Sequence, residues 1–298
     1  MKTFLHDAWY CAGFNDDLAA GALRPIKMLG KPLVLFRLGS GELAALADRC
    51  PHRFAPLSKG CVAAGDVQCP YQGLRFDGEG RCTHNPHDDG AIPKAARVSA
   101  YPALERHGAL WVWMGEAAQA DPALLPDFEA VEQREGWSRV QGYLHVQANY
   151  QLVSDNLMDL SHVPFLHPFL SGSEPPPPDL DPDVRMEQQG DRVVAINQFR
   201  KMPNTPLYQM LWERDAPPAF ISMRANMRWD PPSMMLLDTG GCPVDGRREN
   251  ETSCIPIVAA TIAGRAVYPG WLRRSSSARC HAKPAHRTTP HARASSAA

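Results

Sequence analysis

The chain has 298 residues, and its 31 lysine and arginine residues nearly balance its 32 aspartate and glutamate residues, for a formal net charge of −1 at pH 7. A chain of this length is expected to form two domains that each bury a core. The balanced charge gives no attraction to nucleic acid or to an anionic membrane, and the absence of a leader-like segment or a run of about 20 apolar residues predicts a cytoplasmic protein without a membrane partner.

Residues 1–118 are predicted to form an all-β domain. Turn signals at 30–32 (GKP), 39–42 (GSGE) and 77–80 (DGEG) separate short β-type runs such as 33–38 and 109–114. Eight cysteines at irregular spacings favour free thiols or metal ligands over a disulfide framework.

A second domain, at residues 119–250, is predicted to combine a helix with an antiparallel sheet. Tyr150, Val153, Leu157 and Leu160 recur at steps of three and four, as one face of a helix requires, and Pro164 should end that helix close to His162. The proline-rich stretch 173–183 predicts an extended surface loop. Apolar runs at 192–199, 219–229 and 234–240 predict strands.

Residues 251–298 form an atypical tail. From Thr252 to Ala298 there is no aspartate or glutamate, and arginine, histidine, serine, alanine and proline crowd the end. Because the segment has little apolar material to bury, it is predicted to be disordered. A basic tail for nucleic acid is the alternative reading.

A first set of candidate ligands lies at residues 50–72. Cys50 and His52 form a Cys-x-His pair, and Cys69 and Gln72 form a Cys-x-x-Gln pair. A Rieske [2Fe–2S] centre binds one iron through two cysteines and the other through two histidines, and the spacing fits it. A structural zinc site is the alternative, although zinc motifs usually contain Cys-x-x-Cys. Gln72 stands where the second imidazole is expected, and an amide oxygen is a weak ligand for cluster iron.

A second set of candidate ligands lies on the predicted helix and just after it. Asn156, Asp159 and His162 follow one another at three-residue steps, so neighbours on this face should touch. His167 follows the Pro164 turn. Two histidines at a helix end can bind two adjacent positions of a metal, and a carboxylate would complete a 2-His-1-carboxylate triad.

Together these motifs resemble the oxygenase subunit of Rieske non-haem iron oxygenases, in particular the vanillate and dicamba O-demethylases. The resemblance rests on AWY, CPHRFAPLS, CPYQGL, NPH, LWVWMG and DNLMDLSHxxxxH, and it covers roughly residues 5–245. It implies an α+β fold, in which an N-terminal all-β Rieske [2Fe-2S] domain precedes a helix-grip catalytic domain of antiparallel sheet and helices, here C-terminally incomplete.

The resemblance also implies roles for individual residues. Cys50, His52, Cys69 and Gln72 would hold the [2Fe-2S] cluster, and His162 and His167 would bind catalytic Fe(II). Asn156 would lie beside the iron. Asp159 would pass electrons between subunits of a homotrimer. The roles that the resemblance implies make Asp159 and Asn156 the candidate catalytic residues.

The activity implied is that of a monooxygenase that uses O2 to demethylate a methoxylated or methylated aromatic acid such as vanillate. Hydroxylation of an O-methyl group gives an unstable product that collapses to a phenol and formaldehyde. A reductase with flavin and a plant-type ferredoxin centre would be the electron-supplying partner.

The chain departs from this family in its last part. The family places its carboxylate ligand on a late helix, where this chain has no acidic residue. The loss of family features after about Arg248 is explained by the hypothesis that the tail is a frame-shifted reading. A catalytically impaired relic, or a small-molecule or metal-binding protein of the same fold, is the alternative function.

Overall fold

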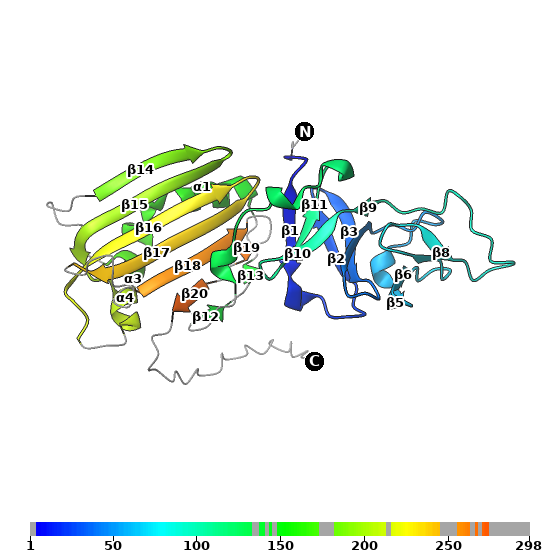
Figure 1. The fold of residues 1–298 in the computed structure, drawn as a ribbon, viewed down its shortest axis with the longest axis horizontal. Helices are drawn as coiled ribbons and strands as arrows, with labels where there is room; N and C mark the ends of the chain where they lie inside the picture. The colour runs from blue at the N-terminus through cyan, green and yellow to red at the C-terminus, as the bar shows by residue number, and fades with distance from the viewer. Residues whose placement is uncertain are drawn as a thin grey trace, which may run out of the picture.

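The computed structural model describes residues 4–132, 148–172, 182–212 and 216–244, and the backbone of strands within 137–144 and 255–273. Figure 1 shows two β-rich parts arranged along the long axis of the molecule. The N-terminal part is all-β, and the C-terminal part is a large antiparallel sheet with helices. The predicted α+β order is therefore confirmed.

The N-terminal part contains three small antiparallel sheets, with strand orders β1-β11-β10, β2-β3-β4-β9 and β5-β6-β7-β8. The strands are β1 (Trp9–Phe14), β2 (Arg24–Met28), β3 (Lys31–Arg37), β4 (Leu43–Ala47), β5 (Cys61–Ala63), β6 (Asp66–Gln68), β7 (Arg75–Phe76), β8 (Cys82–His84), β9 (Ala100–Tyr101), β10 (Ala103–Arg106) and β11 (Ala109–Trp113).

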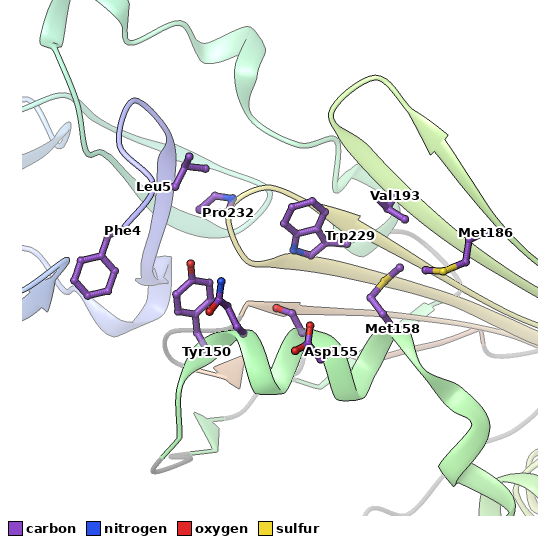
Figure 2. A pocket seen from close by; sticks show the side chains of 11 residues that line it. Phe4, Leu5, Tyr150, Asp155, Met158, Met186, Val193, Trp229 and Pro232 are labelled. Atoms are coloured by element: carbon purple, nitrogen blue, oxygen red, sulfur yellow. The ribbon is translucent and has the colours of Figure 1, made fainter. Parts of the chain in front are cut away.

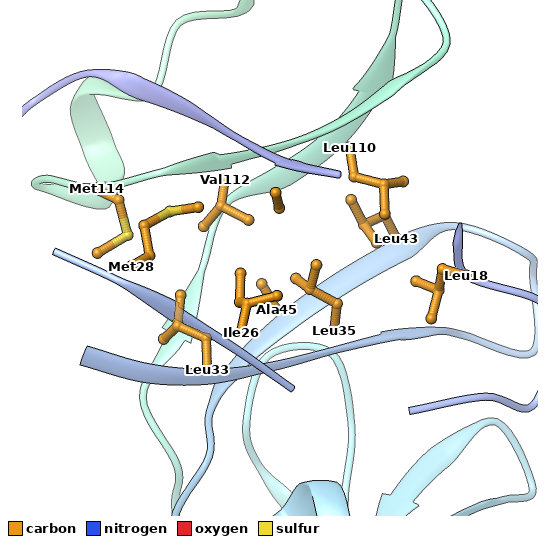
Figure 3. Packing of buried hydrophobic residues seen from close by; sticks show 11 residues of the cluster. Leu18, Ile26, Met28, Leu33, Leu35, Leu43, Ala45, Leu110, Val112 and Met114 are labelled. Carbon is orange, nitrogen blue, oxygen red and sulfur yellow. The ribbon is translucent and has the colours of Figure 1, made fainter. Parts of the chain in front are cut away.

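Strand β3 lies at the centre of this part because both of its faces are buried. Successive side chains of a strand point to opposite faces. Leu33 and Leu35 belong to one core cluster, which includes Leu110 of β11 (Figure 3). Val34 and Phe36 belong to another, which includes the two candidate cluster cysteines. The same strand therefore supports the cysteine loops and joins them to the rest of the part.

The C-terminal part is built on a seven-stranded antiparallel sheet in the order β12-β20-β18-β17-β16-β15-β14, beside a two-stranded sheet of β13 and β19. Its strands are β12 (Trp137–Val140), β13 (Tyr143–Leu144), β14 (Pro182–Gln189), β15 (Arg192–Pro203), β16 (Phe220–Asp230), β17 (Met234–Pro243), β18 (Ile255–Ile262), β19 (Ala266–Val267) and β20 (Gly270–Arg273). The α-helices are α1 (Tyr150–Met158), α2 (Val163–Leu166), α3 (Pro168–Ser171) and α4 (Pro206–Leu211).

Helix α1 packs on the sheet through its C-terminal half. Leu157 and Met158 contact a small core of Ala195, Met227 and Met235 from β15, β16 and β17. In the described ranges, no helix is long and apolar enough to cross a membrane.

Aromatic packing joins the two parts. Trp113 of β11 and Phe128 belong to one buried cluster, which also contains Met234 of β17. Arg228 of β16 donates a hydrogen bond of 2.6 Å to the Asp127 carbonyl, and its guanidinium lies 5.5 Å from the centre of the Phe128 ring. These contacts fix the connecting segment against both sheets.

The predicted end of the first helix is wrong by four residues. Helix α1 ends at Met158, because Asp159 has an extended backbone (φ −98°, ψ 98°) and caps a 3-10 turn at Leu160–His162. Pro164 lies at the start of α2, where a missing amide proton costs nothing. It does not terminate α1.

The prediction that the tail is disordered from residue 251 is wrong for the strands within 255–273. Strand β18 pairs with β17 from Met234 and Ile262 to Gly241 and Ile255, and β20 pairs in turn with β18. The apolar, partly β-branched run IPIVAATI suits a central strand. Residues 274–298, and 173–181 of the predicted surface loop, lie outside the described residues.

Candidate metal centres

Two cysteine loops of the N-terminal part share one backbone pattern. The amide of Cys50 donates to the Ala55 carbonyl (2.9 Å), and the amide of Phe54 donates back to the Cys50 carbonyl (2.9 Å). In the second loop the Cys69 amide donates to the Leu74 carbonyl (2.8 Å), and the Gly73 amide donates to the Cys69 carbonyl (3.1 Å).

The fourth residue after each cysteine has a positive φ, +60° at Phe54 and +77° at Gly73. Glycine adopts this conformation without strain, whereas Phe54 carries a steric cost that the loop must offset. The ring of Phe54 is covered by the Arg49 guanidinium at 3.9 Å. The two loops therefore form the same backbone turn, one with phenylalanine and the other with glycine at the residue of positive φ.

The structure brings the two thiols together. Cys50 and Cys69 are 1% and 2% exposed, and their side chains are within hydrogen-bonding contact. Burial raises the pKa of the Cys50 thiol to about 11, and the neighbouring Cys69 thiol acts in the same direction. Backbone hydrogen bonds from His52 and Arg53 to the Cys50 sulfur oppose this shift.

The other two candidate ligands of the first set lie on the exposed side of the loops. His52 and Gln72 are both exposed. The Gln72 carbonyl is within 2.8 Å of Nε2 of His87, which fixes the backbone at this position. The role of His87 was missed in the sequence, where only its place in the NPH motif marked it.

These features suit a group held by thiolates from inside and by neutral ligands from the surface. Two adjacent buried thiols, with amide protons directed at one sulfur, are the donor set that an iron–sulfur cluster uses. His52 can supply one imidazole. Gln72 supplies an amide in place of the other. Among the described residues Cys50, Cys69 and His52 are not grouped closely enough to hold a metal, so the structure brings together the two thiols alone.

Helix α1 positions the second set of candidate ligands. Its N-terminus is capped by Asn149, whose side chain accepts from the Gln151 amide (3.0 Å). At its other end the Asp159 carboxylate accepts from the Ser161 amide (2.9 Å). Hydrogen bonds from the Ser161 hydroxyl and amide lower the pKa of the Asp159 carboxyl. Asn156 lies on α1 with an exposed side chain.

The two histidines are neighbours. The rings of His162 and His167 are 5.4 Å apart between centroids and nearly perpendicular, at 76°. Nδ1 of His162 is 2.7 Å from the Asp159 carbonyl, which leaves Nε2 as the nitrogen available to a metal. The sequence predicted contact between Asp159 and His162, and the hydrogen bond uses the carbonyl of Asp159. Its carboxylate instead caps the following turn.

The described part of the chain places no third ligand beside these histidines. Among its residues, no group of three or more histidine, cysteine, aspartate or glutamate side chains is arranged to hold a metal. The two imidazoles fit two positions of an iron site. Three exposed apolar side chains lie near these histidines in the sequence, on α2 and α3: Phe165 (85%), Leu166 (68%) and Phe169 (49%). The sequence analysis did not single them out.

Comparison with known families supports both halves of the chain. A model of the Rieske [2Fe-2S] domain matches residues 8–102, and a model of the vanillate O-demethylase oxygenase C-terminal domain matches residues 146–262. The second match extends beyond residue 248, so the family features continue further than the sequence analysis predicted.

Individual relatives give the same result. The oxygenase component of dicamba O-demethylase from Stenotrophomonas maltophilia is 47% identical over 165 residues, which are 55% of this chain and about half (48%) of the relative. The oxygenase component of chloroacetanilide N-alkylformylase from Rhizorhabdus wittichii is 38% identical over 83% of this chain and 69% of the relative.

Solved structures of dicamba monooxygenase are also similar. The one bound to 3,6-dichlorosalicylic acid has a TM-score of 0.80 and 32% identity, over 91% of this chain and 78% of that chain. The one with non-haem iron and dicamba has a TM-score of 0.74 and 33% identity, over 91% and 77%.

Proposed function

The chain belongs to the Rieske non-haem iron oxygenases, and on that premise we propose that it is the oxygenase component of a monooxygenase that demethylates a methoxylated aromatic acid such as vanillate. The observation that carries the proposal is the presence of two donor sets in one chain. One is the contacting thiol pair of Cys50 and Cys69, and the other is the His162 and His167 pair.

We assign the [2Fe-2S] cluster to Cys50, Cys69 and His52, with Gln72 at the fourth position, and Fe(II) to His162 and His167. The cluster would supply single electrons, and the iron would supply activation of O2. The chain's own residues orient these groups: the Asp159 carbonyl holds the His162 ring by Nδ1, and the Asn149 cap fixes the start of the helix that carries Asn156.

The arrangement of the two sites supports electron transfer between subunits. The β5–β8 sheet, whose strands flank the Cys69 loop, lies at one end of the long axis, whereas α1 and α3 lie in the other half (Figure 1). The apolar side chains on α2 and α3 form an exposed patch beside His162 and His167, and such patches mark protein contacts. We therefore place a neighbouring subunit there, with the exposed Asp159 carboxylate at the contact. The homotrimer itself is what the resemblance to the family implies.

The overall reaction balances with two electrons. The aryl methyl ether, O2, two electrons and two protons give the phenol, formaldehyde and water. A reductase with flavin and ferredoxin-type centres would deliver the electrons from a reduced nicotinamide.

The experiment is a coupled turnover assay with a reductase and matched substrates. Because two imidazoles without a carboxylate bind Fe(II) weakly, the assay contains Fe(II) in excess. Vanillate should yield formaldehyde. Guaiacol, which lacks the carboxylate, should yield less, and 4-hydroxybenzoate, which lacks the methoxy group, should yield none.

The control is the double variant His162→Ala/His167→Ala, which should abolish formaldehyde release and leave the cluster spectrum intact. Formaldehyde release that is the same in the double variant would show that the histidine pair does not form the site. Equal rates with guaiacol and vanillate would rule out an aromatic acid as the preferred substrate.

A further inference from the structure

The Asn85-Pro86-His87 motif has no part in the function proposed above, although it lies against the second cysteine loop. Nε2 of His87 is 2.8 Å from the Gln72 carbonyl. Because a carbonyl oxygen only accepts hydrogen bonds, Nε2 carries the proton and donates it. The motif therefore binds the main chain of the loop, independently of the side chain at position 72.

The second cysteine loop has few side-chain contacts of its own to hold it. The side chains of residues 70–72 are exposed, and Gly73 has none. In the first loop, by contrast, the Asp48 carboxylate accepts hydrogen bonds from the amide (2.7 Å) and the hydroxyl (2.6 Å) of Ser58. A segment with few buried contacts opens easily, so the second loop needs support from another segment.

The segment that carries His87 is held by its own hydrogen bonds. Oδ1 of Asn85 accepts from the His87 amide (3.2 Å), and Nδ2 of Asn85 donates to the Ala91 carbonyl (2.8 Å). The Gly90 amide donates to the His87 carbonyl (2.9 Å). Asparagine side chains fix turns in this way. The imidazole is therefore presented to Gln72 by a turn that is already formed.

Pro86 packs against the next residue of the same loop. A β-carbon added to Gly73 would lie 3.1 Å from Cγ of Pro86, which is closer than an ordinary van der Waals contact. Glycine therefore leaves room for the proline ring. The ring of Pro86 and the imidazole of His87 contact Gly73 and Gln72, the two residues that share one rigid, planar peptide group.

The peptide group between Gln72 and Gly73 connects His87 to the cysteine. Its carbonyl accepts from His87, and its amide donates to the Cys69 carbonyl (3.1 Å). Hydrogen bonds in such a chain polarise one another, so donation to the carbonyl strengthens the amide as a donor. The Cys69 thiol in turn contacts that of Cys50. A continuous chain of contacts therefore runs from His87 to the pair of thiols.

We propose that His87 is a positioning residue, which holds the second cysteine loop in the form that places the Cys69 thiol against that of Cys50. Asn85 and Pro86 set its ring in place, and the hydrogen bond from Nε2 holds the loop. The role at a cluster rests on the proposed function, whereas the hold on the loop is a property of the metal-free chain. The two are therefore tested separately.

The first test uses metal-free, full-length protein. NMR follows the exchange of the Gly73 amide with solvent, and mass spectrometry maps the alkylation of Cys69 by a pulse of iodoacetamide. His87→Ala and His87→Met remove the donor and should speed both by about three- to tenfold, which corresponds to the loss of one hydrogen bond. His87→Gln keeps an amide donor at similar reach and should stay within about twofold of wild type. His84→Ala, at the exposed end of β8, is the matched control and should change neither rate. Unchanged rates in His87→Ala, or wild-type rates in His87→Met, would overturn the proposal.

The second test uses the same variants after anaerobic reconstitution with iron and sulfide. In a chelator titration, His87→Ala and His87→Met should lose the visible spectrum of the cluster at about tenfold lower chelator concentration than wild type and His87→Gln. Equal chelator sensitivity of wild type and His87→Ala would overturn the role at the cluster. Wild-type protein that loads no cluster would contradict the proposed function, and the metal-free measurements would still decide whether His87 holds the loop.

Discussion

The substitution Gln72→His should raise the affinity of the N-terminal part for its cluster. The peptide group that follows residue 72 is fixed, because the Gln72 carbonyl contacts Nε2 of His87 at 2.8 Å and the Gly73 amide donates to the Cys69 carbonyl at 3.1 Å. A histidine at this position therefore replaces the side chain without moving the loop. The gain is one imidazole in a set of four ligands.

The size of this effect follows from the ligand count. Loss of a group that only orients a metal ligand lowers metal affinity about 10–100-fold, or about 1.4–2.7 kcal/mol. Because Gln72→His changes a ligand itself, it should raise the affinity for the cluster by at least that factor. The assay is anaerobic reconstitution with iron and sulfide, followed by chelator titration of the visible and EPR spectra. Gln188→His, on the exposed strand β14, is the matched control and should change nothing. If wild type and Gln72→His load equally and lose the cluster at the same chelator concentration, glutamine is a competent ligand and the reasoning fails.

Three further predictions concern the frame that holds the sites. The Tyr208 hydroxyl lies 2.7 Å from that of Thr239, and burial raises the pKa of Tyr208 to about 12. Because the folded protein favours the neutral phenol, the free energy of unfolding should fall as the pH rises from about 10 to 12. The free energy of unfolding in urea is measured at pH 9 and at pH 11. Between these two values the wild type should lose about 1 kcal/mol more stability than Tyr208→Phe, and equal losses would contradict the assignment. Asn149→Ala removes the cap of α1 and should cost about 1 kcal/mol in unfolding free energy, with weaker binding of Fe(II); undiminished stability would show that the cap is dispensable. Phe128→Ala should lower the free energy of unfolding by about 3–5 kcal/mol, because the ring is 2% exposed and packs on Trp111 and Arg228. Calorimetry or urea unfolding measures the loss, and a loss below 1 kcal/mol would mean that other contacts hold the two parts together.

Most strands could be predicted because their pattern is local. The run 33–36 is apolar throughout, as a strand buried on both faces requires, and it forms the middle of β3 (Lys31–Arg37) between two core clusters. The strand β18 was missed because composition was averaged over the whole tail, which concealed a short run of β-branched and apolar residues among basic ones. A window of eight residues would have found it.

The candidate sites were predicted in part. Cys-x-His and Cys-x-x-Gln pairs indicate loops that meet, and the structure brings Cys50 and Cys69 into contact. The hydrogen bonds of Asp159 could not be predicted, because they depend on where α1 ends, and this is decided by a single extended residue. A cavity of about 660 Å³ where the N-terminal segment, α1 and the large sheet meet (Figure 2) was also hidden, since its walls come from segments that are far apart in the sequence, Phe4 to Pro232.

The central claim, that this chain is a Rieske oxygenase that demethylates an aromatic acid at the His162 and His167 site, is tested most directly by a single-turnover experiment. Protein loaded with Fe(II) and sulfide, chemically reduced and freed of excess reductant, is mixed with vanillate and O2, and formaldehyde and the catechol product are quantified per chain. The account predicts equal amounts of the two products, limited by the reduced cluster content, and none from His162→Ala/His167→Ala. The absence of both products from fully loaded wild-type protein, or their release by the double variant, would contradict it.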